Sequence, residues 1–207
     1  MIQDAQGKKE KAEVLNMDYD GSLIKDRFGY KFFRDEYKPL GVILSFRGKM
    51  EVTDNLIDLE DALSKDYIYS DDAINFCWEI PNLNNLGAVF FQRLFCTYVS
   101  LLLRQYEDQP LKISGDDILL ILPEDETSSS KEIKTQKVSV SITKTLANNV
   151  TVGHLGINIF AGEKAPNFAG NIKRLKDPQT LSDFVSQVEY LFYSTVNSCF
   201  VATTKVI

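Results

Sequence analysis

The pattern of apolar and polar residues is clearest between residues 111 and 160, where three short runs rich in Val and Ile are separated by turn-forming residues. Such runs predict strands, and we expect these three to belong to one sheet. In the second run, apolar and polar side chains alternate, with Val138, Val140 and Ile142 against Lys137, Ser139, Ser141 and Thr143. Alternation of this kind is typical of a half-buried strand. The polar side of this strand, with the chain's only histidine, His154, on the third run, is the candidate site.

Other segments predict the elements around this region. Short apolar runs predict further strands at 41–46, 67–69 and 73–80. Helical spacing of apolar residues predicts helices at 52–63, at 86–106 and from 178 to about 199. The last helix begins at Asp177-Pro178, because proline is favoured at the first helical position. Together these elements predict an α+β fold in which a mixed β-sheet is covered by helices packed largely on one side.

The chain has 207 residues, which suits one domain with a sizeable core. We expect a flexible, polar N-terminal lead over residues 1–17 and a single α+β domain over 18–207. The insert at 123–136 is poor in apolar residues and long for a hairpin connection, so we expect it to be mobile.

Charge and hydropathy limit the partners. The formal net charge is −6, and a protein that neutralises phosphates needs a basic face, so nucleic acid is not expected as a partner. The N-terminus lacks the apolar segment of a secretory signal, and the apolar run at 90–103 is interrupted by Gln92 and Arg93 and short for a bilayer. We therefore expect a cytoplasmic protein without membrane contact. The helix at 86–106 is apolar nearly all round, which favours a homo-oligomer.

The cysteines give no sign of a disulfide framework or a metal site. Cys77, Cys96 and Cys199 are odd in number, far apart and each within an apolar run, so we expect buried thiols. The sequence contains no CxxC or HExxH pattern, and no metal ligands are assigned.

Three motifs then occur in a fixed order: Ser114-Gly115-Asp116-Asp117, the strand that opens with Lys137, and Gly153-His154-Leu155-Gly156-Ile157-Asn158. In type and order they resemble the catalytic core shared by biotin protein ligases, lipoate-protein ligases and octanoyltransferases. Over its whole length the chain looks more like an uncharacterised family, a domain of unknown function, whose pattern includes the Phe46-Arg47-Gly48 turn and Asp71-Asp72. We interpret that family as a distant branch of the ligase-like, class II synthetase-like fold.

The resemblance implies roles for six residues. Lys137 would approach the carbonyl or phosphate of an acyl or acyl-adenylate group and stabilise its developing negative charge. Asp116 or Asp117 would hold a magnesium ion or an adenylate ribose. His154 would orient a substrate or move a proton near neutral pH. Lys137 and His154 are thus the candidate catalytic residues, and the candidate substrate-binding residues are Arg47, Asp116, Asp117 and Asn158.

Two departures from the ligase pattern leave the chemistry open. Residues 52–72 contain no glycine, whereas ligases wrap the nucleotide with a glycine- and arginine-rich loop; ATP use would require Arg47-Gly48-Lys49 to substitute for it. Residues 165–170 contain no thiol for the covalent relay of octanoyltransferases. One hypothesis is therefore an acyl or acyl-adenylate site with a small-molecule acyl ligand. The other is a non-catalytic, homo-oligomeric binding or assembly protein that retains the fold. No cofactor is assigned.

Overall fold

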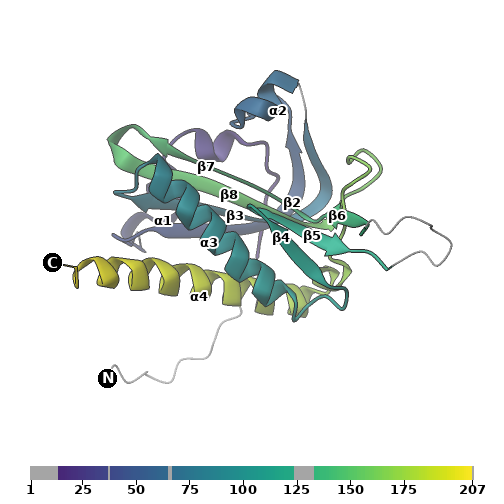
Figure 1. The fold of residues 1–207 in the computed structure, drawn as a ribbon. Helices are drawn as coiled ribbons and strands as arrows, with labels where there is room; N and C mark the ends of the chain where they lie inside the picture. Colours follow the sequence, from purple (N-terminus) through teal and green to yellow (C-terminus); the bar gives the residue numbers. More distant parts are fainter. Residues whose placement is uncertain (1–13, 37, 65–66, 124–132, 207) are drawn as a thin grey trace.

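A computed structural model describes residues 14–36, 38–64, 67–123 and 133–206 (Figure 1). Within these residues, five strands form one sheet in the order β1-β2-β3-β8-β7. Their bounds are β1 Leu15–Asn16, β2 Val42–Val52, β3 Ile68–Pro81, β7 Ser139–Leu146 and β8 Val150–Phe160. β1 runs parallel to β2 and the other pairs are antiparallel, so the sheet is mixed, as the sequence predicted.

A smaller antiparallel sheet of the described chain has the order β4-β5-β6. Its strands are β4 Leu111–Ser114, β5 Asp117–Ile121 and β6 Thr135–Lys137. The expectation that the run at 111–122 lies in the same sheet as the next two runs is wrong. Gly115, with φ of +66°, lets the chain reverse inside that run, so the run folds as the β4–β5 hairpin. Lys137 ends β6, and Val138 alone separates it from the start of β7 in the large sheet.

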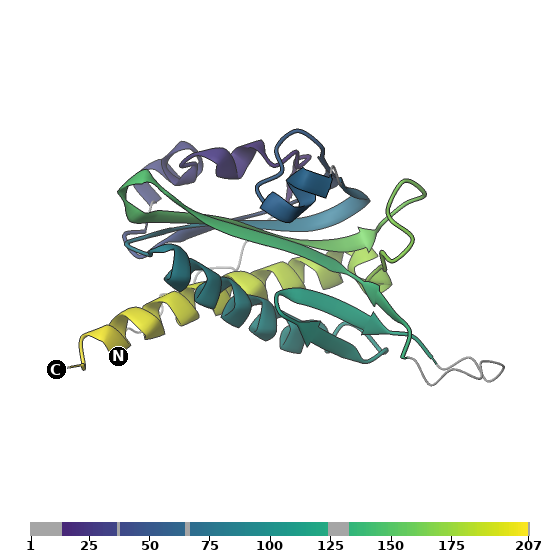
Figure 2. The same cartoon turned by 45° about the horizontal axis from the view of Figure 1, so that its top comes forward.

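The long helices α3, Asn85–Leu103, and α4, Pro178–Thr203, lie on one side of the large sheet (Figure 2). The opposite side carries the first part of the chain and the connection between β2 and β3. The short helices are α1 Gly29–Phe33 and α2 Leu59–Ser64, with 3-10 turns at Ser22–Lys25, Arg34–Glu36, Ala147–Asn149 and Lys173–Lys176. Helices therefore cover mainly one face, as expected, and leave the other face to irregular segments.

Side chains of the central strand β3 alternate between two hydrophobic cores. Ile74, Phe76 and Trp78 are fully buried in the core beneath α3 and α4. Ala73 and Cys77 belong to the second core, on the opposite face. This period of two is the reason why one strand supplies both cores.

Glu79, on the same central strand, is completely buried and tied to the N-terminal segment. One carboxylate oxygen accepts hydrogen bonds from Arg27 Nε at 2.9 Å and Nη2 at 2.7 Å. The other accepts from the backbone N–H groups of Phe28 and Gly29, each at 2.9 Å. A buried carboxylate is tolerated when it is hydrogen-bonded in this way, and Glu79 thereby holds residues 27–29 against the sheet.

The start of α4 follows the sequence prediction. Asp177 Oδ2 accepts a hydrogen bond from the backbone N–H of Thr180 at 2.8 Å, which caps the helix, and Pro178 occupies its first turn.

Along α3, Phe95, Cys96 and Val99 are fully buried in the domain. Among the described residues, α3 is the helix long and apolar enough to cross a membrane. Its side chains Phe95, Cys96 and Val99 belong to the hydrophobic core beneath the large sheet, as in the core helix of a globular domain.

Several local predictions differ from the structure. The helix expected at 52–63 begins only at Leu59, because Val52 still pairs with Ile68 in the β2–β3 ladder. The strands expected at 67–69 and 73–80 are one strand, β3, with a register shift beside Asp72. Cys77 and Cys96 are buried as expected, but Cys199 is exposed near the end of α4.

The predicted flexible lead and polar insert fall largely outside the described residues. Residues 1–13 and 124–132 are not described, and Leu15–Asn16 already forms β1.

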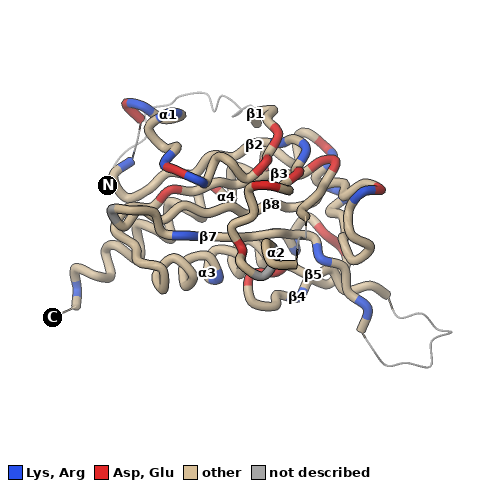
Figure 3. The backbone as a smooth tube through the Cα atoms, turned by 90° about the horizontal axis from the view of Figure 1, so that it is seen from above, with Lys and Arg blue, Asp and Glu red and all other residues tan. Residues whose placement is uncertain are grey.

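Figure 3 shows Lys and Arg interspersed with Asp and Glu along the described chain. The absence of nucleic-acid and membrane partners stays a prediction.

Candidate functional site

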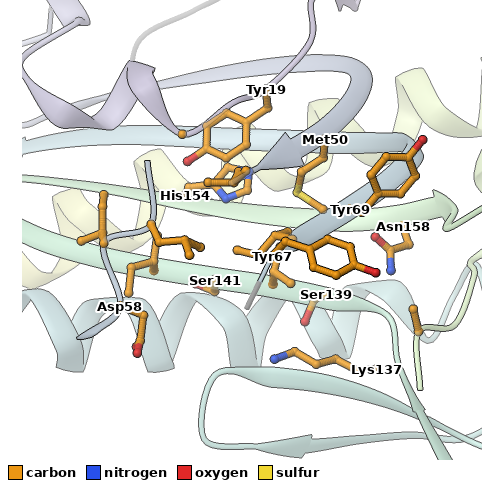
Figure 4. A pocket seen from close by; sticks show the side chains of 18 of the residues that line it. Tyr19, Met50, Asp58, Tyr67, Tyr69, Lys137, Ser139, Ser141, His154 and Asn158 are labelled. Carbon is orange, nitrogen blue, oxygen red and sulfur yellow. The ribbon is translucent and has the colours of Figure 1, made fainter. Parts of the chain in front are cut away.

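A cavity of about 600 Å³ lies on the face of the large sheet opposite α3 and α4 (Figure 4). Strands β7 and β8 provide its floor, and the N-terminal segment around Tyr19 closes one side. The connection between β2 and β3 contributes residues 55–58 and Tyr67, and the start of β3 contributes Ile68 and Tyr69. The β4–β5 turn contributes Asp116 and Asp117. The site therefore joins segments that are far apart in the sequence.

The cavity has a polar and an apolar part. Figure 4 places Lys137, Ser139 and Asn158 at one end, and Asp58 at the other. Along β7, which follows Lys137 in the chain, Val140 and Ile142 add apolar side chains to the wall. Further apolar lining comes from Ile24, Met50, Val52, Leu56, Ile57 and Ile68 and, beside Lys137, from Pro166, Phe168 and Ala169. A site of this size and composition suits a small ligand with an apolar body and one polar group.

Lys137 is fixed by its backbone at the polar end. Its N–H donates to Phe168 O and its carbonyl accepts from Gly170 N, both at 2.8 Å. The ammonium lies 2.8 Å from Asp117 Oδ1, and both side chains are about one-third exposed. The two motifs that the sequence analysis linked are thus in direct contact.

Asp116, the neighbour of Asp117 in the β4–β5 turn, is held from beneath by α3. Gln92 Nε2 donates to Asp116 Oδ2 at 2.9 Å and to Ser141 Oγ at 3.0 Å. Burial raises the pKa of Asp116, and the nearby charge of Asp117 raises it further. Within the residues that the structure describes, no three His, Cys, Asp or Glu side chains gather as metal ligands. A hard cation at this turn stays a prediction.

His154 lies in the floor of the cavity as a neutral ring. Its Nε2 is 2.9 Å from Asn75 Oδ1, and Asn75 Nδ2 faces the carbonyl of Ala73 at 3.4 Å. This orientation of the amide makes His154 Nε2–H the donor, so Nδ1 carries no proton. Burial lowers the pKa of His154 to about 3. Of the two expected roles, orienting a substrate suits this environment, whereas proton transfer near neutral pH does not.

Asn158, four residues further along β8, also lines the cavity. Its side chain is 5% exposed, and Nδ2 donates to the carbonyl of Gly170 at 3.2 Å. Among the described residues, its Oδ1 has no hydrogen-bond partner. A buried acceptor without a donor costs free energy, so its presence beside a cavity points to a ligand group.

Arg47 is not part of this cavity. Its Nε and Nη2 donate to Asp72 Oδ1 and Oδ2 at 2.8 and 2.7 Å, a two-pronged ion pair. With Lys49 it lines a separate hollow beside the start of α4. The structure therefore brings together Lys137, His154, Asp116, Asp117 and Asn158 but leaves Arg47 apart.

Sequence reasoning missed the walls formed by Tyr19, Tyr67 and Tyr69, for which no local motif gives a signal.

Residues 9–207 match the family described as a domain of unknown function, DUF366. The chain belongs to this family. A relative, the uncharacterised protein MJ0805 of Methanocaldococcus jannaschii, is 30% identical over 148 residues, which cover 69% of this chain. The chain spans 59% of the length of that relative.

Two solved structures share the fold of this DUF366 chain. A protein of unknown function from Pyrococcus horikoshi has a TM-score of 0.74 and 23% identity, with 93% of each chain covered. P. falciparum LipL1 in complex with lipoate has a TM-score of 0.53 and 14% identity, with 88% of this chain and 60% of that chain covered. The predicted similarity to the biotin and lipoate ligase core is confirmed at the level of the fold, at a distant relationship.

Proposed function

We propose that this protein binds a small acyl ligand in the cavity, with the acyl chain along Val140 and Ile142 and the carbonyl oxygen at Lys137. The observation that carries this proposal is the ammonium of Lys137, the lysine among the described lining residues, at the polar end of a cavity that has apolar side chains along β7. Burial of an acyl chain supplies about 0.8 kcal/mol per methylene, so the apolar wall provides affinity and Lys137 provides orientation. The fold shared with LipL1, whose complex contains lipoate, supports the same class of ligand.

Acyl transfer, including transfer from an acyl-adenylate, is the reaction that we propose for this site. Attack by a nucleophile of the acceptor on the acyl carbonyl would place negative charge on its oxygen, and the ammonium of Lys137 would stabilise this charge. The carbonyl would re-form as the donor's leaving group departs, which is AMP for an acyl-adenylate, and the acceptor's proton would pass to solvent. His154 would shape the floor as a neutral ring. The segment that replaces a nucleotide loop lines the cavity with Leu56, Ile57 and Tyr67 and contains no glycine, which favours the acyl chain over phosphate there.

A thermal shift screen tests the proposal. The ligands are octanoate, lipoate, biotin, ATP with magnesium and non-hydrolysable acyl-adenylates. A ligand at about one hundred times its dissociation constant adds about 2.7 kcal/mol, which raises the midpoint by several degrees. We expect a shift with an acyl ligand in the wild type and in Lys144→Met, which removes a lysine of β7 outside the cavity, but a smaller one in Lys137→Met. An absence of any shift in the wild type would reject the acyl site.

A second proposal is a homo-oligomeric binding or assembly protein without turnover, in the cytoplasm. The observation that favours assembly is a set of exposed apolar side chains on the long helices, Leu86, Phe90 and Leu101 of α3 and Tyr190 and Phe200 of α4. Light scattering of the wild type and of Phe90→Glu would test it. We expect a dimer or larger species that dissociates in the variant; a monomeric wild type would reject the proposal.

A further inference from the structure

The polar end of the cavity combines the amide oxygen of Asn158, which has no partner among the described residues, with the carboxyl groups of Asp116 and Asp117. From this arrangement we infer that the cavity receives its acyl group as a carboxamide, R–CO–NH–, in preference to the free carboxylate. The inference rests on the acyl ligand proposed above and specifies its head group.

Asn158 is the first observation. Its Oδ1 is a buried acceptor without a partner among the described residues, while its Nδ2 is already used by Gly170. In Figure 4 the amide oxygen of Asn158 points toward the other labelled side chains of the cavity. An acceptor in this position requires an N–H or O–H donor, and a ligand carboxylate at neutral pH has none.

The second observation is that several donors around the cavity are already used within the protein. The ammonium of Lys137 gives one of its three N–H groups to Asp117 at 2.8 Å. The hydroxyl of Tyr67 donates to Lys164 O at 2.9 Å, and that of Tyr69 donates to Asp71 Oδ1 at 2.6 Å. A carboxylate would add two acceptors to a region that already contains those of Asn158 and the β4–β5 turn.

Charge leads to the same preference. Asp116 and Asp117 line the polar end with Lys137 as the cation among the described lining residues; Arg93, near the same turn, is exposed and does not line the cavity. A ligand carboxylate would therefore face two carboxyl groups across one ammonium that is already paired. A carboxamide is neutral, so it avoids this repulsion.

A carboxamide complements both kinds of group at the polar end, because it carries an acceptor for the ammonium of Lys137 and a donor for the amide oxygen of Asn158. Its carbonyl oxygen accepts from Lys137, and its N–H donates to Asn158 Oδ1 or to a carboxylate oxygen of Asp117. The hydroxyl oxygens of Ser139 and Ser141 already accept from Ile118 N at 2.9 Å and Gln92 Nε2 at 3.0 Å, so each offers its O–H to the carbonyl of either ligand. The amide N–H is thus the feature that separates the two ligand classes.

Calorimetric titration of octanamide and octanoate at pH 7.5 tests the inference. We expect the wild type to bind octanamide at least tenfold more tightly than octanoate. Asn158→Leu removes the unpaired acceptor and should bring the two affinities within about threefold. Val140→Ala, which shortens the apolar wall, should weaken both ligands and keep their ratio.

The outcomes are distinct. Equal or tighter binding of octanoate by the wild type would overturn the inference and leave the acyl site in place. No binding of either ligand would overturn both proposals. If Asn158→Leu does not fold, as judged by its circular dichroism spectrum, the wild-type ratio alone decides.

Discussion

The imidazole of His154 lies flat against the phenol ring of Tyr19, with the ring centroids 3.8 Å apart and the planes 14° from parallel. Tyr19 comes from the N-terminal segment and His154 from β8, so this stack fastens the first described part of the chain to the floor of the cavity. Burial raises the pKa of Tyr19 well above its ordinary value, so both rings are neutral at physiological pH.

The first prediction concerns the pH dependence of stability. The pKa of His154 is about 3 in the folded protein and about 6.5 when unfolded, so the unfolded state binds more protons between these values. Stability should be fully present above about pH 6.5 and fall by about 1.4 kcal/mol per unit, from this residue alone, as pH drops toward 3. Urea unfolding of the wild type and His154→Phe from pH 4.5 to 7.5 measures it. The variant should show the shallower slope; parallel slopes would contradict the buried neutral ring.

The second prediction concerns Glu79. Replacement by Gln removes the charge that Arg27 and two backbone N–H groups share, and should lower the free energy of unfolding by about 3 kcal/mol. Asp72→Asn is the matched control, because the Arg47–Asp72 pair is partly exposed and should contribute about 1 kcal/mol or less. Similar losses in the two variants, measured by denaturant titration, would show that burial of Glu79 does not decide its contribution.

The third prediction concerns Gly153. A Cβ at this position would lie 2.2 Å from Trp78 Cζ2, and the ring is fully buried and unable to move away cheaply. Gly153→Ala should therefore lower the thermal midpoint by several degrees. In Gly87→Ala of α3 the added Cβ would lie 2.9 Å from the flexible end of Leu83 and 3.4 Å from Asn84 Oδ1, and the residue gains helix propensity, so the midpoint should change little. A tolerated Gly153→Ala would mean that the β8–Trp78 packing is looser than described.

The fourth prediction concerns the thiols. Cys199 is exposed, whereas Cys77 and Cys96 are buried, and burial raises the pKa of Cys96 to about 12. An aromatic disulfide reagent should therefore modify Cys199 rapidly in the native protein and the other thiols only after denaturation. Cys199→Ser should abolish the rapid phase; a rapid phase that survives in this variant would place a second thiol at the surface.

The sequence was sufficient for the elements with strong local signals. Helices α3 and α4 have long apolar periodicity, and Asp177-Pro178 marks the start of α4, so both were predicted nearly to their ends. The motifs at Asp116, Lys137 and His154, which the sequence grouped together, line the same cavity, and their roles stay predictions.

Non-local contacts explain what the sequence did not reveal. The run at 111–122 has the composition of any buried strand, so its separation into a second sheet follows only from the reversal at Gly115. Arg47 looked available for an anion, but its partner Asp72 is 25 residues away and meets it through the pairing of β2 and β3. The tyrosine walls likewise depend on how the β2–β3 connection folds over the sheet.

The alternation of β3 between two cores has a consequence for the evolution of the family. Substitutions at Met50, Val140 or Ile142 alter the shape of the cavity without touching the side chains that pack beneath α3 and α4. Deleting or inserting one residue in β3 would instead exchange the two faces and disrupt both at once. The shape of the cavity is therefore free to diverge by point substitution, whereas a change in the length of the central strand would disturb the whole scaffold.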